Sequence, residues 1–544
     1  MRHGLCGLFG KILPMIAALA ILSGCAGNRA SDSIAAASTS PSAGEPVQSA
    51  SENSGETEAP EQVLKIARDF EGASFDPAAA TTANDYMFAP MVFERLLTYD
   101  SDFIIQPMLA EEWAVSEDRL AYTFKLRKGV QFHRGYGELT SGDVKFSFER
   151  LADPELNAAS NYANLGVENM ASIETPDNYT VVITLKEEDP NFLIKTATYY
   201  GNIVSQKAFE DIGGQKFGVM PVGTGPFECV EGAILGERNE VIRFEDYWGE
   251  KALLDRMTFQ LVSEPGTMFN AFEAGEVDLI NITDYDKLEQ YRSQPEKYNI
   301  YMVTSRSMLY VGNNMALEPF TDARVREAMF YAIDRDSLIN DFYLGFPNPA
   351  RSILPSTSMF SIDDYWDPEY DLEKAKRLLA EAGFPNGFTT EFYCPNDSIS
   401  MGPATIIQSQ LASAGINAQL QTVDFGVFLD KVRAGEAPLW LLFNDTNIVP
   451  DNTLSRYTSE YYPGSNWSGI MDADYDAAVK AALSETDESK RAALYADAQR
   501  KLIDMKAVYT VCDSEGYNVT AAKVKGFDFS ADLTIRFDKV YITE

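Results

Sequence analysis

Histidine limits the chemistry that this chain can perform. The sequence of 544 residues contains two histidines, and His3 lies in the N-terminal leader, so only His133 is left for the folded protein. Zinc sites with two or three histidine ligands are therefore excluded. A serine or cysteine nucleophile activated by histidine would have to use His133. Because His133 directly follows a predicted strand, we expect it to be a packing or surface residue.

Nucleotide, redox and hydrolase motifs are also missing from the sequence. It contains no CxxC pair, GxSxG elbow, GxxxxGK[ST] loop or GxGxxG fingerprint. The Gly-Thr-Gly at residues 223–225 lacks the lysine of a phosphate loop, which predicts a tight turn into a strand. Cys229, Cys394 and Cys512 are too few for a disulfide framework and are expected to be buried thiols. We therefore expect a protein that is not an enzyme and has neither a cofactor nor a metal ion.

The chain is strongly acidic. It has 45 lysine and arginine residues against 81 aspartate and glutamate residues, which gives a formal net charge of −36. Such a chain repels phosphate backbones and anionic lipid surfaces, which excludes nucleic-acid binding and polybasic docking to membranes. Hydrophobic residues make up 45% of the sequence, which is enough for sizeable cores.

The N-terminus is typical of an exported lipoprotein. Arg2 and Lys11 form a positive region, and residues 12–22 form an apolar run too short to span a bilayer. The tetrapeptide Leu22-Ser-Gly-Cys25 resembles the bacterial lipobox, which predicts cleavage after residue 24 and lipidation of Cys25. An ordinary signal peptide followed by an incidental cysteine is the alternative. Residues 26–60 are rich in Ala, Ser, Gly and Glu and are expected to be a flexible tether.

Strand and helix patterns alternate along the rest of the chain. Apolar residues in alternation predict strands at residues 122–127, 179–185 and 416–423. Apolar stripes predict helices that begin near residues 140, 322 and 371 and helices at residues 406–414, 474–484 and 490–503. Arg324 and Arg326, on the second of these helices, are expected to make salt bridges. Alternation of this kind predicts an α/β fold.

A set of collinear segments resembles the family 5 extracellular solute-binding proteins, which serve ABC importers of oligopeptides, dipeptides and related solutes. The strongest match is PFTDARVREAMFYAID at residues 319–334. Each segment alone is a weak signal, but their order along about 300 residues identifies the chain as a member of this family. The other matching segments are residues 75–77, 106–113, 122–133, 139–144, 221–227, 247–248, 275–278 and 375–388.

The resemblance implies an α/β fold of the type II periplasmic-binding-protein kind, with two lobes linked by hinge segments and an extra α/β domain. Lobes of this kind close on the ligand. The implied division is a signal peptide at 1–24, the lipidated cysteine and linker at 25–60, a discontinuous lobe I at 61–94, 190–310 and 509–544, the extra domain at 95–189, and lobe II at 311–508.

Peptide-binding members hold an extended peptide between the lobes by strand addition, and an aspartate of lobe II pairs with the α-ammonium of the peptide. That aspartate belongs to a GW-x-x-D-x-x-D/E-P stretch, to which WLLFNDTNIVP at residues 440–450 corresponds here. Because the spacing differs, Asp445 is the first candidate for the ammonium partner, and Asn447 and Asp451 are alternatives.

The length and class of the ligand stay open. Dipeptide-binding members carry an arginine after a turn that reads Pro395-Asn-Asp-Ser398 here, which argues against a strict dipeptide site. Longer peptides remain, as does a non-peptide solute such as an oligosaccharide. The aromatic and amide side chains expected to line the cleft are those of Tyr310, Asn313, Asn314, Trp440, Phe443 and Trp467.

The resemblance thus implies a lipid-anchored, extracytoplasmic receptor that captures a peptide and delivers it to the permease and ATPase subunits of an ABC importer. The receptor is expected to be a monomer. The alternatives are a receptor for another solute, and a surface protein for signalling or chaperoning that binds peptide without transport.

Overall fold

The computed structural model describes residues 60–544, apart from residues 69–73, 80–82, 157, 231–237, 365–368, 447 and 530–533. The predicted leader, the predicted lipidation site Cys25 and the predicted tether up to residue 59 therefore lie outside the described residues, as does Asn447.

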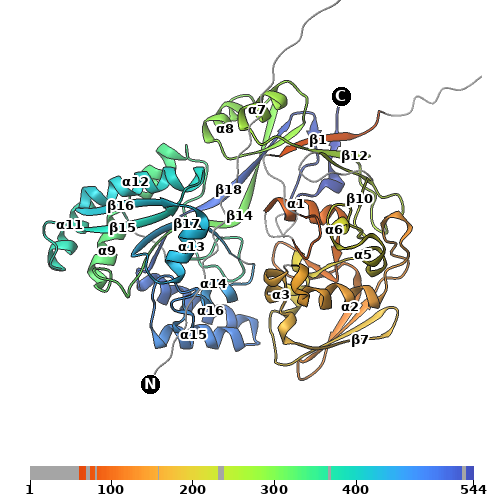
Figure 1. Ribbon diagram of the computed structural model, residues 1–544, viewed down its shortest axis with the longest axis horizontal. Helices are drawn as coiled ribbons and strands as arrows, with labels where there is room; N and C mark the ends of the chain where they lie inside the picture. The colour runs from red at the N-terminus through yellow and green to blue at the C-terminus, as the bar shows by residue number, and fades with distance from the viewer. Residues whose placement is uncertain are drawn as a thin grey trace, which may run out of the picture. The chain divides into compact units, whose positions relative to one another are not determined.

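A ten-stranded mixed sheet organises the described chain (Figure 1). Its parallel neighbours are β1 with β12 and β13, and β15 with β16 and β17. Between these two groups run β18 and β14, which are antiparallel to each other. The strand order is β10 (Phe227–Cys229), β11 (Arg238–Arg243), β12 (Arg256–Leu261), β1 (Val63–Arg68), β13 (Leu279–Ile282), β18 (Val508–Ala521), β14 (Tyr298–Asn313), β17 (Leu439–Asp445), β15 (Phe388–Pro395) and β16 (Ile416–Val423).

The long strands β14 and β18 connect the two halves of this sheet. The second half of β18 pairs with β13, whereas the second half of β14 pairs with β17. The register between β14 and β18 shifts between Thr304 and Met308, so the ladder is irregular where the chain passes from one half to the other. The lobe boundaries predicted at residues 310–311 and 508–509 fall within β14 and at the start of β18, and they stay a prediction.

A separate four-stranded antiparallel sheet lies inside residues 95–189. Its order is β5 (Ala110–Val115), β6 (Ala121–Leu126), β8 (Thr180–Leu185) and β7 (Met170–Asp177). The strands predicted at 122–127 and 179–185 are confirmed as β6 and β8. Three two-stranded sheets complete the described strands: β2 (Glu94–Arg95) with β9 (Asn202–Ile203), β3 (Leu97–Tyr99) with β4 (Ile105–Pro107), and β19 (Val524–Lys525) with β20 (Tyr541–Ile542).

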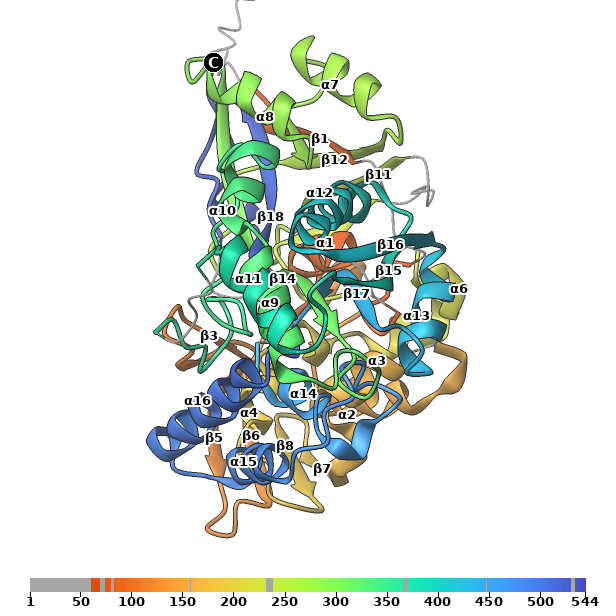
Figure 2. The same ribbon diagram turned by 90° about the vertical axis from the view of Figure 1, so that its left-hand side faces the viewer.

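Aspartate caps set the beginnings of most predicted helices. Asp322, Asp371 and Asp472 each accept a backbone N–H bond at the start of α9 (Ala323–Ala332), α11 (Leu372–Glu381) and α15 (Ala473–Ser484). Asp487 does the same for α16 (Glu488–Asp504), which lies beside α15 in both views (Figures 1 and 2). At α2 (Ser141–Glu149), the Asp143 carboxylate accepts from the N–H and the hydroxyl of Thr140.

One helix is longer than its pattern predicts. The helix predicted at 406–414 is the second half of α12 (Ser398–Ala414), which Asp397 caps and which contains Pro403. The first half was not predicted as helix because it contains Gly402 and Pro403, and both residue types disfavour helix interiors. The other described helices are α1 (Ala83–Val92), α3 (Ala159–Leu165), α4 (Phe192–Thr196), α5 (Gln206–Ile212), α6 (Gly214–Phe217), α7 (Pro265–Glu273), α8 (Tyr285–Arg292), α10 (Arg335–Ser337), α13 (Phe425–Arg433) and α14 (Asp451–Ser455).

The Gly-Thr-Gly turn packs against His133, a contact that neither of the two separate predictions included. A Cβ on Gly223 would lie 2.0 Å from the carbonyl oxygen of Val92, so the turn needs glycine for its close approach to α1. His133 is completely buried. Its Nδ1 accepts the Gly223 N–H at 3.3 Å, and its Nε2 lies 2.9 Å from the Gly225 carbonyl oxygen. This pattern requires a neutral ring with its proton on Nε2.

Glu94 holds the same turn from another side. Its carboxylate accepts hydrogen bonds from the Thr224 hydroxyl at 2.8 Å, the Tyr247 hydroxyl at 2.9 Å and the Trp248 indole at 2.7 Å. These contacts give both His133 and Glu94 a role in packing around the turn. Cys229, Cys394 and Cys512 are buried thiols, which confirms that prediction.

One prediction about charge needs correction. The salt bridge predicted for Arg326 is wrong: its guanidinium is buried and donates to the carbonyl oxygens of Phe320, Thr321 and Met505. Arg324 does pair with Asp322, at 2.6 Å. Among the helices of the described residues, none combines the length and the apolar character that crossing a bilayer requires.

Candidate ligand-binding site

The pairing of β14 with β17 positions the first site residues. Tyr310 lies opposite Leu442, and Gly312 lies opposite Trp440. The Trp440 ring packs directly over Gly312, since a Cβ there would lie 2.0 Å from the indole. Only glycine leaves room for this ring, so the sheet itself fixes the position of Trp440.

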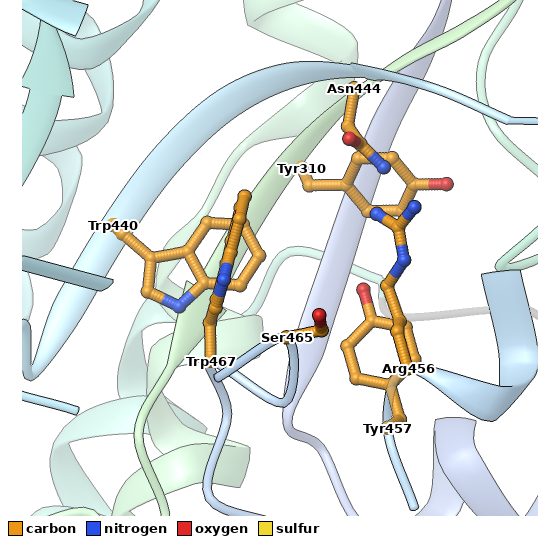
Figure 3. A pocket seen from close by; sticks show the side chains of 7 residues that line it. All are labelled: Tyr310, Trp440, Asn444, Arg456, Tyr457, Ser465 and Trp467. Atoms are coloured by element: carbon orange, nitrogen blue, oxygen red, sulfur yellow. The ribbon is translucent and has the colours of Figure 1, made fainter. Parts of the chain in front are cut away.

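Trp440 belongs to a small aromatic pocket that we call the Arg456 pocket (Figure 3). Trp467 meets Trp440 edge to face, with ring centroids 5.5 Å apart. The cavity measures about 10 Å³, which is close to the space of one water molecule. The residues that line it are Tyr310, Trp440, Asn444, Arg456, Tyr457, Ser465 and Trp467.

The structure therefore brings together three of the predicted ligand-binding residues: Tyr310, Trp440 and Trp467. Tyr310 and Trp440 are almost fully buried, and the Tyr310 hydroxyl donates to the carbonyl oxygen of Ile353 at 2.9 Å. Such packing makes the walls of the pocket rigid.

Asn313 and Asn314 lie elsewhere, at the end of β14 and just after it. Both side chains are completely buried. Asn313 donates to the carbonyl oxygen of Lys506 at 2.8 Å, and Asn314 donates to that of Gly435 at 3.0 Å while accepting the Ala316 N–H. These bonds hold the backbone around them, and the two amides do not line the Arg456 pocket.

Phe443 lies on the other face of β17 from Trp440, because side chains alternate along a strand. It is half-buried against the core of the second half of the chain, and so it is not brought together with the aromatic pocket. Asp445 is the last residue of β17, and its backbone pairs with Ser307 of β14. The role expected of Asp445 stays a prediction.

The segment after β17 contacts the other half of the described chain. Ile448 and Val449 pack in the core cluster built mainly from residues 64–259. Asp451 accepts a hydrogen bond from Asn191 at 2.8 Å and one from Tyr495, and Asn452 donates to Asn164 at 2.9 Å. Asp451, the third candidate for an ammonium partner, is therefore engaged in contacts that join the two halves.

Lys195 adds charge to this junction. It pairs with Asp189 at 2.7 Å. Burial acts to lower the pKa of Lys195, but the carboxylates of Asp189 and Asp451 outweigh it and the net shift is upward. The junction is thus a charged, hydrogen-bonded contact of the kind that can form and break when lobes close and open.

Sequence reasoning missed Asn444, Arg456, Tyr457 and Ser465. One signal was available for Arg456, which is the only lysine or arginine between Arg433 and Lys480. An isolated cation in an acidic stretch of chain is a reason to ask what it faces. No cluster of histidine, cysteine, aspartate or glutamate that could hold a metal ion occurs within the described ranges.

Relatives of known type share this architecture. Heme-binding protein A of Haemophilus influenzae is 30% identical over 481 residues, covering 83% of this chain and 87% of that protein. Di/tripeptide-binding protein 1 of Pseudomonas aeruginosa is 30% identical over 496 residues, covering 84% and 90%. The periplasmic binding protein DppA of Helicobacter pylori, solved with the peptide STSA, has a TM-score of 0.74 and 28% identity, covering 89% of this chain and 98% of that structure.

The family model is decisive. The model for the bacterial extracellular solute-binding proteins, family 5 (middle), matches residues 105–465. Members of this family are extracytoplasmic binding proteins and not enzymes, in line with the relatives above. The expected type II binding-protein fold is confirmed by these structural neighbours. The chain belongs to the family 5 extracellular solute-binding proteins.

Proposed function

We propose that this protein is the receptor of an ABC importer, captures an extended peptide between its two lobes and delivers it to the permease and ATPase subunits. The observation that carries the proposal is the pair of strands β14 and β18, which run through both halves of one sheet, together with the Asp451 contacts that join the halves. Such an arrangement lets a ligand shift an open state toward a closed one. Relatives named for di- and tripeptides support a peptide as the cargo.

Mass spectrometry of the solute released from purified protein tests the cargo directly. Recovery of peptides supports the proposal. Recovery of an oligosaccharide instead would favour the second candidate, a receptor for a non-peptide solute. The measurement does not depend on choosing a candidate ligand in advance.

Anchoring through Cys25 is part of the proposal. Lipid chains contribute about 0.8 kcal/mol per buried CH₂, so two or three chains would hold the protein firmly at the membrane. We expect Cys25→Ala to move the protein from the membrane fraction to the soluble fraction. Cell fractionation with mass analysis of the N-terminus measures this. Unchanged fractionation of the variant, with residues 1–24 still attached, would contradict lipidation.

Asp445 is proposed as the partner of the peptide α-ammonium. A buried ammonium needs a paired carboxylate, because an unpaired buried charge costs several kcal/mol. We expect Asp445→Asn to weaken peptide binding by about 30- to 1,000-fold, measured by titration calorimetry. An N-acetylated peptide should bind the wild type weakly and lose little more in the variant. If Asp445→Asn binds free-amine peptide normally, another residue holds the ammonium.

A further inference from the structure

Two apolar side chains leave the hydrophobic core of their own half of the chain and enter that of the other half. β17 packs in the cluster of the second half through Leu439 and Leu441. A few residues later, Ile448 and Val449 are buried in the cluster built mainly from residues 64–259, where they are 4% and 6% exposed. The chain therefore crosses from one core to the other immediately after β17.

Met359 enters the same cluster from another segment of the second half. It is 8% exposed, and its N–H donates to the carbonyl oxygen of Ile448 at 2.8 Å, which fixes the two segments to each other. Phe360, the next residue, packs against both clusters. We call Met359, Ile448 and Val449 the apolar clasp. These residues belong to the predicted lobe II, whereas the core that receives them comes mainly from the predicted lobe I and extra domain.

Polar groups form a rim around the clasp. Asp451 accepts from Asn191, and Asn452 donates to Asn164. Figure 1 shows α14, which carries Asp451 and Asn452, beside α3, which carries Asn164. The cavity that remains at this contact measures about 20 Å³, which leaves room for one or two water molecules. The two surfaces therefore fit closely.

The rim and the clasp differ in how firmly they hold the two halves together. Hydrogen bonds at a rim are exchanged for bonds to water when the contact opens, and salt weakens the attraction between charges. Apolar burial has no such replacement, since Ile448 and Val449 would face water after opening. The clasp is thus the main attraction between the halves, and it comes from the chain itself.

We propose that the apolar clasp keeps the two halves closed in the unliganded protein, so that loading requires a transient opening. The inference rests on the proposed function in so far as the halves are lobes that move about β14 and β18. A ligand then stabilises a state that is already populated, and it does not have to supply all of the free energy of closing. The clasp also slows release, because it must open again before the cargo leaves.

The distance between two spin labels measures closure without any ligand. The three thiols of the described residues are buried, so the labels attach to the cysteines introduced by Glu174→Cys on β7 and Lys480→Cys on α15. Both positions are exposed, and Figure 1 shows β7 and α15 in different halves of the molecule. The mature chain carries Cys25→Ala, and it is unfolded and refolded before the measurement to remove bound solute.

The chain with an intact clasp should give one short distance by double electron–electron resonance. Val449→Asp places a charge in the apolar contact and should shift the equilibrium toward a longer distance by about 10-fold or more. Ile448→Ala, which adds no charge, should shift it in the same direction to a smaller extent. Val427→Asp is the matched control, because Val427 lies on α13 and is 47% exposed, and it should leave the distance unchanged.

Sodium chloride at about 1 M should not lengthen the distance when the clasp is intact. Opening by salt would mean that the charged rim holds the halves, and it would overturn the inference. A mainly long distance with the clasp intact would overturn it too, as would an unchanged distance in Val449→Asp that circular dichroism shows to be folded. If Val449→Asp does not fold, Ile448→Ala decides by the same criterion. Recovery of cargo by mass spectrometry tests the proposed function independently of these distances.

Discussion

Replacing Asp76 by alanine should lower the free energy of unfolding by about 3–5 kcal/mol. Asp76 forms an ion pair with Arg150, and both side chains are deeply buried, at 4% and 5% exposure. Removal of the carboxylate leaves the guanidinium buried without its counter-charge. Asp76 also accepts the N–H of Ala78 at 3.0 Å, a bond that is lost in the same variant.

A double-mutant cycle with Arg150→Met separates the pair from general damage to the core. The Arg150 guanidinium lies 4.8 Å from the Phe209 ring centre, so a methionine can occupy the same apolar surroundings. Denaturant unfolding of Asp76→Ala, Arg150→Met and the double variant measures the coupling. The double variant should be more stable than the sum of the two single losses predicts. Additive losses would contradict the buried pair.

Asp76 also shows why segments that reveal a family need not contact its ligand. It lies in Phe75-Asp-Pro77, one of the segments that identified the chain, and its partner Arg150 follows α2 from another part of the sequence. His133 likewise belongs to a family segment, and its ring holds the turn at residues 223–225. In both segments the identity of the residue is restricted by the packing contacts that its side chain makes.

Helices and strands were predictable where a local rule decides them. Asp322 and Asp371 act as caps through bonds to backbone two or three residues away, so a short stretch of sequence contains the whole signal. Arg326 shows the limit of that reasoning. Its guanidinium donates to backbone carbonyl oxygens, one of them at Met505, far away in the sequence, and the expected salt bridge was wrong.

The candidate site was only partly predictable, because its residues come from separate segments. Tyr310, Trp440 and Trp467 line one pocket, whereas the amides of Asn313 and Asn314 donate to backbone carbonyl oxygens, and a ligand-binding role for these residues stays a prediction. Residue type indicated stacking or hydrogen-bonding ability for all five. Which of them face a cavity depends on the pairing of β14 with β17, and a single sequence does not specify that pairing.

The stability of the protein should respond to pH through two buried groups that act in opposite directions. Burial raises the pKa of Glu94 from 4.5 to about 7, although hydrogen bonds from Trp248, Thr224 and Tyr247 act against the shift. Burial lowers the pKa of His133 from 6.5 to about 4, against the effect of its bond to Gly225. Both groups touch the same Gly-Thr-Gly turn.

The signs follow from which state binds the proton. As pH rises from 4.5 to 7, the unfolded chain loses the Glu94 proton first, so stability falls by about 3 kcal/mol. As pH falls from 6.5 to 4, the unfolded chain takes up the His133 proton first, so stability again falls by about 3 kcal/mol. In the wild type the two contributions nearly cancel between pH 4.5 and 6.5.

Substitution of either group should reveal the pH dependence of stability that the other group causes. His133→Gln keeps one donor and one acceptor for the turn but does not titrate, so its stability relative to the wild type should rise by about 3 kcal/mol on acidification from pH 6.5 to 4. Glu94→Gln should change in the opposite sense, gaining about 3 kcal/mol over the wild type as pH rises from 4.5 to 7. Denaturant unfolding across this range measures both variants. Parallel curves of stability against pH for the two variants would contradict the assignment. The curves should have opposite slopes because folding neutralises Glu94 by protonation and His133 by deprotonation.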